Sequence, residues 1–154
     1  MHINLQKASA YRYIFDMKKN TDQTYDTGCP VAFALRMFGD PWTLLVIRDL
    51  AIKGARTYSE LLEGGEGIST NILAQRLKQL EENGLVSKTR DPENWRSFLY
   101  TLTDKGRDLA PVLAEIILWS GKHNHADNAM TDTVKKVRRD RSGFEQSIRN
   151  GAVP

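Results

Sequence analysis

Residues 69–102 read STNILAQRLKQLEENGLVSKTRDPENWRSFLYTL, and within this stretch the hydrophobic period changes from helical to alternating. After Ser69, a good N-cap, leucines recur at the spacing of one helical face until Asn83-Gly84 ends the helix. The residues that follow alternate, which predicts strands over 85–90 and 98–102 joined by a turn. The stretch therefore predicts a helix followed directly by a β-hairpin.

Upstream of this stretch the pattern predicts three more helices. The first begins at Pro30 and ends at Gly39, and the second has Asp40 as its N-cap and continues to about Lys53. Residues 56–58 are short and extended, and a brief third helix begins at Ser59. The glycine-rich turn that follows it is too short to be a linker.

Downstream, Thr103 is predicted to cap one long helix that ends near His123. We expect three parts in the chain: a partly flexible N-terminal extension over 1–28, a domain over 29–126, and a charged tail or helix over 127–154. The predicted fold is mainly α with a small β-hairpin. Two short helices around a tight turn, followed at once by a hairpin, are typical of a winged helix-turn-helix.

Several segments resemble one family of regulators. They are Cys29-Pro30-Val31-Ala32, Trp42-Thr43-Leu44-Leu45-Val46-Ile47-Arg48-Asp49-Leu50, Tyr58-Ser59-Glu60-Leu61, Gly67-Ile68-Ser69, Leu73-Ala74-Gln75-Arg76-Leu77, Leu80-Glu81-Glu82-Asn83-Gly84-Leu85-Val86 and Tyr100-Thr101-Leu102-Thr103-Asp104-Lys105-Gly106. In this order they resemble the HxlR-type winged-helix regulators of bacteria and archaea, which are related to MarR-type regulators. The resemblance covers about residues 29–123.

The resemblance implies a repressor or activator that binds double-stranded DNA as a homodimer. It also implies that the first and last helices of the domain form the dimer interface. Some members of the family sense oxidants or reactive electrophiles through a cysteine just before the first helix, which is the position of Cys29.

In a winged helix-turn-helix, the second helix of the pair enters the major groove, and here that helix begins at Ser69. Asn and Gln side chains can pair with adenine, and the methyl group of Ala can contact that of thymine, whereas Arg and Lys suit phosphates. The candidate DNA-reading residues are Ser69, Thr70, Asn71, Ala74, Gln75, Arg76 and Lys78. The alternative is an ordinary solvated helix face.

A second set of residues is predicted to contact the DNA backbone or an adjacent groove. Arg56 and Ser59 lie near the start of the preceding helix, where hydroxyl and amide groups can bind phosphate. Lys88, Arg90 and Arg96 lie in the hairpin. The alternatives are an N-cap role for Ser59 and solubilising charges on an edge ribbon for the hairpin cations.

Cys29 is the single cysteine of the chain, so an internal disulfide is impossible. A thiol at a helix N-terminus experiences the positive end of the helix dipole, which makes it more reactive. Sensing by Cys29 requires an adduct or a bond between protomers. The alternative is a small residue that packs at the dimer interface.

Composition limits the other possibilities. The net charge is +3, and residues 29–126 contain 12 basic and 12 acidic side chains, so only local clustering can attract DNA. No apolar stretch suggests a membrane span or a signal peptide, and we expect a cytoplasmic location. The aromatic residues Trp42, Tyr100 and Trp119 are interpreted as core or interface anchors rather than a ligand pocket.

We predict no cofactor, metal site or enzymatic activity. His123 and His125 are two residues apart without an acidic or thiol partner at ligand spacing, so they are interpreted as a helix end. Two rival functions remain. One is a winged-helix protein-interaction module that does not bind DNA, and the other is a thiol enzyme that uses Cys29.

Overall fold

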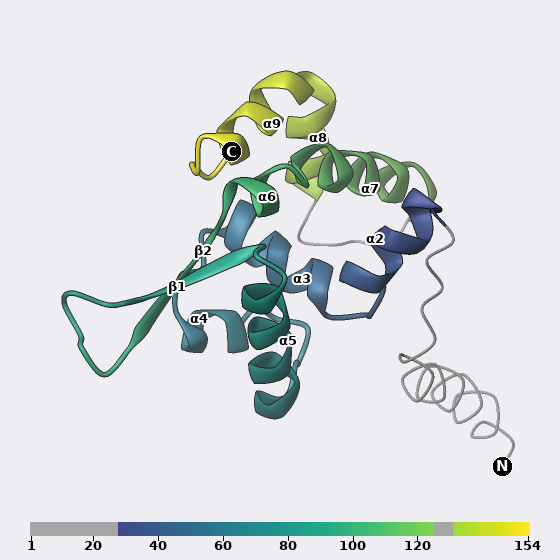
Figure 1. Ribbon diagram of the computed structural model, residues 1–154. Helices are drawn as coiled ribbons and strands as arrows, with labels where there is room; N and C mark the ends of the chain where they lie inside the picture. Colours follow the sequence, from purple (N-terminus) through teal and green to yellow (C-terminus); the bar gives the residue numbers. More distant parts are fainter. Residues whose placement is uncertain (1–27, 125–130) are drawn as a thin grey trace, which may run out of the picture. The chain divides into compact units, whose positions relative to one another are not determined.

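The computed structural model describes residues 28–124 and 131–154 (Figure 1). Its contacts divide the chain into a unit that ends at Arg36 and a unit over residues 37–154, and each is described by itself. Helix α2 (Pro30–Phe38) begins in the first unit, where the backbone N–H of Phe33 donates to the carbonyl of Cys29 at 3.0 Å. The predicted helix from Pro30 to Gly39 is confirmed.

The second predicted helix is also present, in two parts. Helix α3 (Thr43–Arg48) continues into a π-helical turn, η2 (Asp49–Lys53). The helix begins at Thr43 with Trp42 at the N-cap position, two residues later than predicted. Asp40 still stabilises this start, because its Oδ1 accepts from the backbone N–H groups of Trp42 at 2.9 Å and Thr43 at 3.1 Å. The helix buries an apolar face that contributes Val46, Ile47, Leu50 and Ala51 to the core.

Helix α4 (Tyr58–Leu62) begins one residue earlier than predicted. Its N-cap is Thr57, whose hydroxyl accepts from the backbone N–H of Glu60 at 3.3 Å, while the Glu60 carboxylate accepts from Thr57 N–H at 2.8 Å. This reciprocal capping box leaves Ser59 inside the first turn. The alternative interpretation of Ser59 as the N-cap is therefore wrong.

Helix α5 (Thr70–Glu82) and the hairpin agree closely with the prediction. The Ser69 hydroxyl accepts from the backbone N–H of Ile72 at 3.4 Å, so Ser69 is the N-cap. Strands β1 (Val86–Arg90) and β2 (Phe98–Leu102) pair antiparallel, with Val86 opposite Leu102 and Arg90 opposite Phe98. The mainly helical fold with a two-stranded hairpin is confirmed as a winged helix-turn-helix arrangement.

The long helix predicted after Thr103 is divided into α6 (Asp104–Arg107) and α7 (Ala110–His123). Thr103 does cap the first part, since its hydroxyl accepts from Gly106 N–H at 3.2 Å. Pro111 explains the break. It has no N–H for the carbonyl of Arg107, and in a continuous helix its ring would clash with that carbonyl.

The C-terminal segment forms two helices, α8 (Thr131–Arg139) and α9 (Arg141–Arg149), that pack against α7 (Figure 1). Val137, Phe144 and Ile148 are at most 3% exposed and belong to the same hydrophobic core as α3 and α5. This charged segment therefore contributes apolar side chains to the core. The limits predicted for the three parts of the chain stay a prediction.

The described residues contain neither a single membrane-spanning helix nor a cluster of metal ligands. No single helix there is long and apolar enough to cross a membrane, although α2 together with Thr43–Lys53, bent by 79°, passes by length and composition only. No group of three His, Cys, Asp or Glu side chains in the same ranges is placed to hold a metal ion. His125 lies outside these ranges.

Candidate nucleic-acid interface

Helix α5 has one buried face and one exposed face. Leu73, Leu77 and Leu80 are at most 3% exposed and fix the helix against the core. The opposite face is exposed and presents most of the predicted DNA-reading side chains, namely Ser69, Thr70, Asn71, Ala74, Gln75 and Lys78. This face offers amide, hydroxyl and methyl groups together, which is the chemistry needed to read base edges in a major groove.

The first turn of α5 is attached to the preceding helix. The Tyr58 hydroxyl of α4 donates to the carbonyl of Thr70 at 2.7 Å. Helices α4 and α5 are thereby joined both by their turn and by a hydrogen bond across it. The geometry holds the N-terminal end of α5, where base-reading side chains are concentrated in helix-turn-helix proteins, in a defined place.

Arg76 is a predicted site residue whose position does not suit DNA contact. Its side chain is 8% exposed, and its Nη1 lies 3.2 Å from Asp40 Oδ2. The same guanidinium donates to Gln79 Oε1 at 2.6 Å, while its Nε is buried and has no hydrogen-bond partner in the described part of the chain. Arg76 joins α5 to the cap of α3, so the predicted phosphate contact does not fit this structure.

A group of ionic contacts holds the glycine-rich turn between α4 and α5. Arg48 donates to both oxygens of Glu66, at 2.6 and 2.7 Å, and also to Asp49 Oδ1 at 2.6 Å. Lys53 Nζ lies 3.3 Å from the same Asp49 oxygen and donates to the carbonyl of Gly64 at 2.6 Å. We call these five residues, Arg48, Asp49, Lys53, Gly64 and Glu66, the turn clamp.

Burial strengthens the turn clamp. The side chain of Asp49 is 6% exposed and that of Arg48 is 13% exposed. A Cβ atom at position 64 would collide with the Asp49 carboxylate, so only glycine lets the turn approach η2 this closely. The hydrogen bonds from Arg48 hold the pKa of Glu66 below its ordinary value. The clamp therefore depends on the charge of Glu66.

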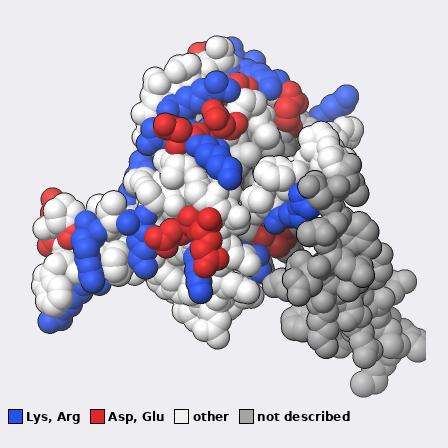
Figure 2. All heavy atoms as spheres, viewed as in Figure 1, with Lys and Arg blue, Asp and Glu red and all other residues white. Residues whose placement is uncertain are grey.

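The hairpin has one basic face. Lys88 and Arg90 lie on the same side of β1, next to the Phe98 ring of β2. The centroid of this ring is 4.1 Å from Lys88 Nζ and 4.3 Å from Arg90 Cζ. These cation–π contacts hold the two charges side by side. Figure 2 shows Lys and Arg side chains along the hairpin, at the left of the view. The arrangement suits contact with phosphates.

The hairpin tip is ordered by local hydrogen bonds and carries both signs of charge. Arg90 Nη1 donates to the carbonyl of Trp95 at 2.8 Å, and Arg96 Cζ lies 5.5 Å from the centroid of the Trp95 ring. Trp95 is 72% exposed. The sequence predicted Arg96 as a site residue but not Trp95 or Phe98. The pairing of Arg90 with Phe98 could have been predicted once the turn between the two strands was located.

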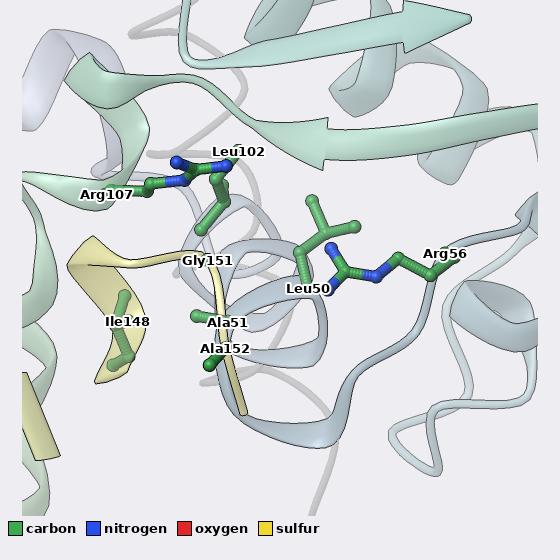
Figure 3. Close-up of a pocket in the computed structure, with 8 residues that line it drawn as sticks. All are labelled: Leu50, Ala51, Arg56, Leu102, Arg107, Ile148, Gly151 and Ala152. Carbon is green, nitrogen blue, oxygen red and sulfur yellow. The ribbon is translucent and has the colours of Figure 1, made fainter. Parts of the chain in front are cut away.

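The other predicted contacts are dispersed. Ser59 is exposed in the first turn of α4. Arg56 lines a hollow that it shares with Arg107, Leu102 and Ile148 (Figure 3). Cys29 is exposed directly before α2.

Three comparisons with known proteins agree with this geometry. The model of the HxlR-like helix-turn-helix family matches residues 37–128. The uncharacterized HTH-type transcriptional regulator sll1512 of Synechocystis is 38% identical over 96 residues, which span 61% of this chain and 70% of that protein. The HTH-type transcriptional regulator YodB of Bacillus subtilis is 36% identical, over 62% of this chain and 85% of YodB.

Solved structures of two regulators are similar as well. The reduced form of YodB superposes with a TM-score of 0.53 at 31% identity, covering 65% of this chain and 98% of that one. The redox regulator HypR in its oxidized form superposes with a TM-score of 0.55 at 26% identity, covering 64% of this chain and all of HypR. The family match ends at residue 128, so α8 and α9 lie beyond it.

Proposed function

This chain belongs to the HxlR-like helix-turn-helix family, and we propose that it is a sequence-specific DNA-binding transcription regulator. The observation that carries the proposal is the exposed face of α5 next to the basic face of the hairpin. The relatives sll1512 and YodB are both named as HTH-type transcriptional regulators. Such a protein acts in the cytoplasm on DNA and needs no catalytic site.

Helix α5 enters the major groove in this proposal. Asn71 and Gln75 read base edges, with adenine the favoured partner, and Ala74 packs against a thymine methyl group. Lys78 contacts a phosphate, although it also lies 3.7 Å from Glu82 in the free protein. Lys88, Arg90 and Arg96 of the hairpin contact the backbone or the adjacent groove.

The regulator acts as a homodimer on a pseudo-palindromic site. Its last matched helix, α7, exposes large apolar side chains, with Ile116 at 42% and Trp119 at 67%. Burying such residues against a second copy removes apolar surface from water. Two α5 helices would then enter successive major grooves about 34–36 Å apart. Sedimentation of native protein and of Trp119→Glu tests this, since the substitution should yield monomers.

Selection of bound sequences from a random DNA pool tests the DNA-binding proposal, and we expect a palindromic consensus. Gln75→Glu and Lys78→Glu should abolish the shift of a selected fragment, because each places a carboxylate against DNA. Gln146→Glu on α9 makes the same change of charge as Gln75→Glu, far from α5, and should bind normally. Failure to select any sequence would favour the protein-interaction module instead.

Cys29 is proposed as a sensor of oxidants or electrophiles. The support is its exposure directly before α2 and the similarity to YodB and to HypR, which is described as a redox regulator. Diamide should weaken DNA binding by native protein, through a disulfide between two Cys29 thiols, and should have no effect on Cys29→Ser. The same DNA-binding assay with methylglyoxal in place of diamide distinguishes an adduct on Cys29 from a disulfide. Equal responses of native protein and Cys29→Ser would exclude this role.

A further inference from the structure

Trp95, at the tip of the hairpin, is the most exposed large apolar side chain in the described part of the chain, at 72%. Other strongly exposed ones, such as Val31 in α2 and Trp119 in α7, lie on the two helices that the family resemblance assigns to the dimer interface. Trp95 instead lies in the loop between β1 and β2, which projects beyond α4 (Figure 1). The proposed dimer interface therefore does not account for its exposure.

Hydrogen bonds hold the loop that carries Trp95. The backbone N–H of Asp91 donates to the carbonyl of Ser97 at 3.2 Å, and Ser97 N–H donates to the carbonyl of Asn94 at 2.7 Å. Arg90 of β1 donates to the carbonyl of Trp95 itself at 2.8 Å. Because the backbone at Trp95 is already fixed, covering its ring with a partner costs little conformational entropy.

Cations lie next to the indole ring. Arg96 Cζ is 5.5 Å from the ring centroid, and Arg90, bound to the Trp95 carbonyl, belongs to the basic face of the hairpin. Figure 2 shows both signs of charge on the hairpin, at the left of the view. Residues 88–98 contain three basic and two acidic side chains, namely Lys88, Arg90, Arg96, Asp91 and Glu93. An apolar ring with a small excess of positive charge suits a partner that is anionic and also has apolar surfaces.

The minor groove of DNA has both properties. Deoxyribose rings form its walls and phosphates form its rim, and its width of about 6 Å admits a flat ring edge-on. In A·T-rich DNA the groove has an enhanced negative potential that attracts arginine. Guanine places an amino group in this groove, whereas A·T pairs present only acceptors there. An aromatic ring therefore enters most easily at A·T pairs.

We propose that Trp95 inserts its indole ring into the minor groove beside the bases that α5 reads, with Arg96 next to it, and makes the protein prefer A·T pairs there. This inference rests on the proposed DNA-binding function and adds a specificity-determining residue to it. Contacts of hairpin cations with phosphates carry no sequence information directly. Trp95 supplies such information, because its entry depends on the amino group of guanine.

Fluorescence anisotropy with a DNA fragment selected by the native protein tests this inference. The base pairs that flank each half-site are made A·T, G·C or hypoxanthine·C, and the last pair resembles G·C in the major groove but lacks the amino group in the minor groove. Native protein should bind the A·T and hypoxanthine·C fragments equally. It should bind the G·C fragment roughly tenfold more weakly, which is a typical effect of one unfavourable base pair.

Three variants separate the ring from the charges around it. Trp95→Ala should bind all three fragments with one reduced affinity, roughly tenfold below that of native protein for A·T flanks, as for the loss of one aromatic contact with nucleic acid. Trp95→Phe retains a flat ring and should keep the preference. Lys88→Gln removes a charge from the basic face and should weaken binding to all three fragments equally while the preference remains. Because Trp95 is exposed, the circular dichroism spectrum of Trp95→Ala should match that of native protein.

The outcomes distinguish this inference from the function on which it rests. If native protein bound all three fragments equally, or if Trp95→Ala kept the preference, the inference would be overturned and DNA binding would still stand. If hypoxanthine·C behaved like G·C, the preference would arise in the major groove, which would also overturn the inference. Failure of native protein to bind any selected fragment would overturn both the inference and the proposed function.

Discussion

Arg76 shows how the position of a single residue determines its role. It lies at the third position after Leu73 and directly before Leu77, and therefore falls within the buried stripe of α5. The helix directs a cation into the interior, where Asp40 accepts it. Because Asp40 also accepts from the backbone N–H groups of Trp42 and Thr43, this ion pair joins α5 to the start of α3.

Arg76→Gln is expected to lower the free energy of unfolding by roughly 2 kcal/mol. Breaking a fully buried pair costs about 3–5 kcal/mol, and Asp40, which is 20% exposed, keeps its contacts with Trp42 and Thr43. Urea denaturation measures the effect, with the exposed Lys78→Gln as the control. An Arg76→Gln protein of native stability that fails to bind DNA would instead support the original prediction of a phosphate contact.

At the scale of elements, the turn clamp and the basic face of the hairpin hold the two parts of the proposed DNA surface. The clamp fixes the turn between α4 and α5 through Arg48 and Glu66. On the hairpin, the Phe98 ring brings Lys88 and Arg90 together. The clamp joins residues that are 18 positions apart, and the hairpin contacts join two neighbouring strands, so each stabilises a relation between elements rather than one element.

The turn clamp predicts a specific dependence of stability on pH. The pKa of Glu66 is lowered from 4.5 in the folded protein, so its contribution is fully present above 4.5 and is lost as the pH falls through the lowered value. Glu66→Gln should be less stable than native protein near neutral pH, and the difference should shrink in acid. Urea denaturation of both proteins over a pH series measures it. A difference that stays constant would contradict an ionic clamp.

The hairpin predicts a dependence on salt. Each cation that contacts a phosphate releases about one counterion, so Lys88→Gln and Arg90→Gln should each reduce the slope of log K against log salt by about 1. Fluorescence anisotropy with a selected DNA fragment over a range of potassium chloride concentrations provides the slopes. Lys135→Gln on α8, far from the hairpin, should leave the slope unchanged. If both hairpin variants gave the same slope as native protein, the hairpin would not be part of the DNA interface.

At the scale of the whole molecule, the C-terminal helices belong to the core of the unit formed by residues 37–154. Val137, Phe144 and Ile148 belong to one hydrophobic cluster with residues of α3, α5 and α7, and α8 and α9 pack against α7. Arg141 pairs with Glu115 of α7 and with Glu145, and Lys136 donates to the carbonyl of Pro154 at 2.8 Å. We therefore expect this unit to unfold as one.

Phe144→Ala should lower the free energy of unfolding by about 3–5 kcal/mol, because the ring is 3% exposed and its removal leaves a cavity. The transitions followed by tryptophan fluorescence and by circular dichroism should coincide, as they do in a two-state protein. The exposed Gln146→Ala on the same helix is the control. A separate early transition in Phe144→Ala would show that α8 and α9 unfold independently.

The sequence alone determined the order of elements from Pro30 to Leu102 and the face of α5 that is exposed. Caps and hydrophobic periods act within a few residues, so they can be recognised without knowledge of distant partners. The break before α7 was also local, since Pro111 is visible in the sequence, but the pattern of apolar residues obscured it.

Tertiary structure alone decided the position of Arg76 and the turn clamp. Each depends on which groups from distant parts of the chain surround a charge: Asp40 beside Arg76, and Glu66 beside Arg48. The sequence does not show whether a charged side chain faces water, a carboxylate or an apolar surface, because its neighbours are determined only when the chain folds.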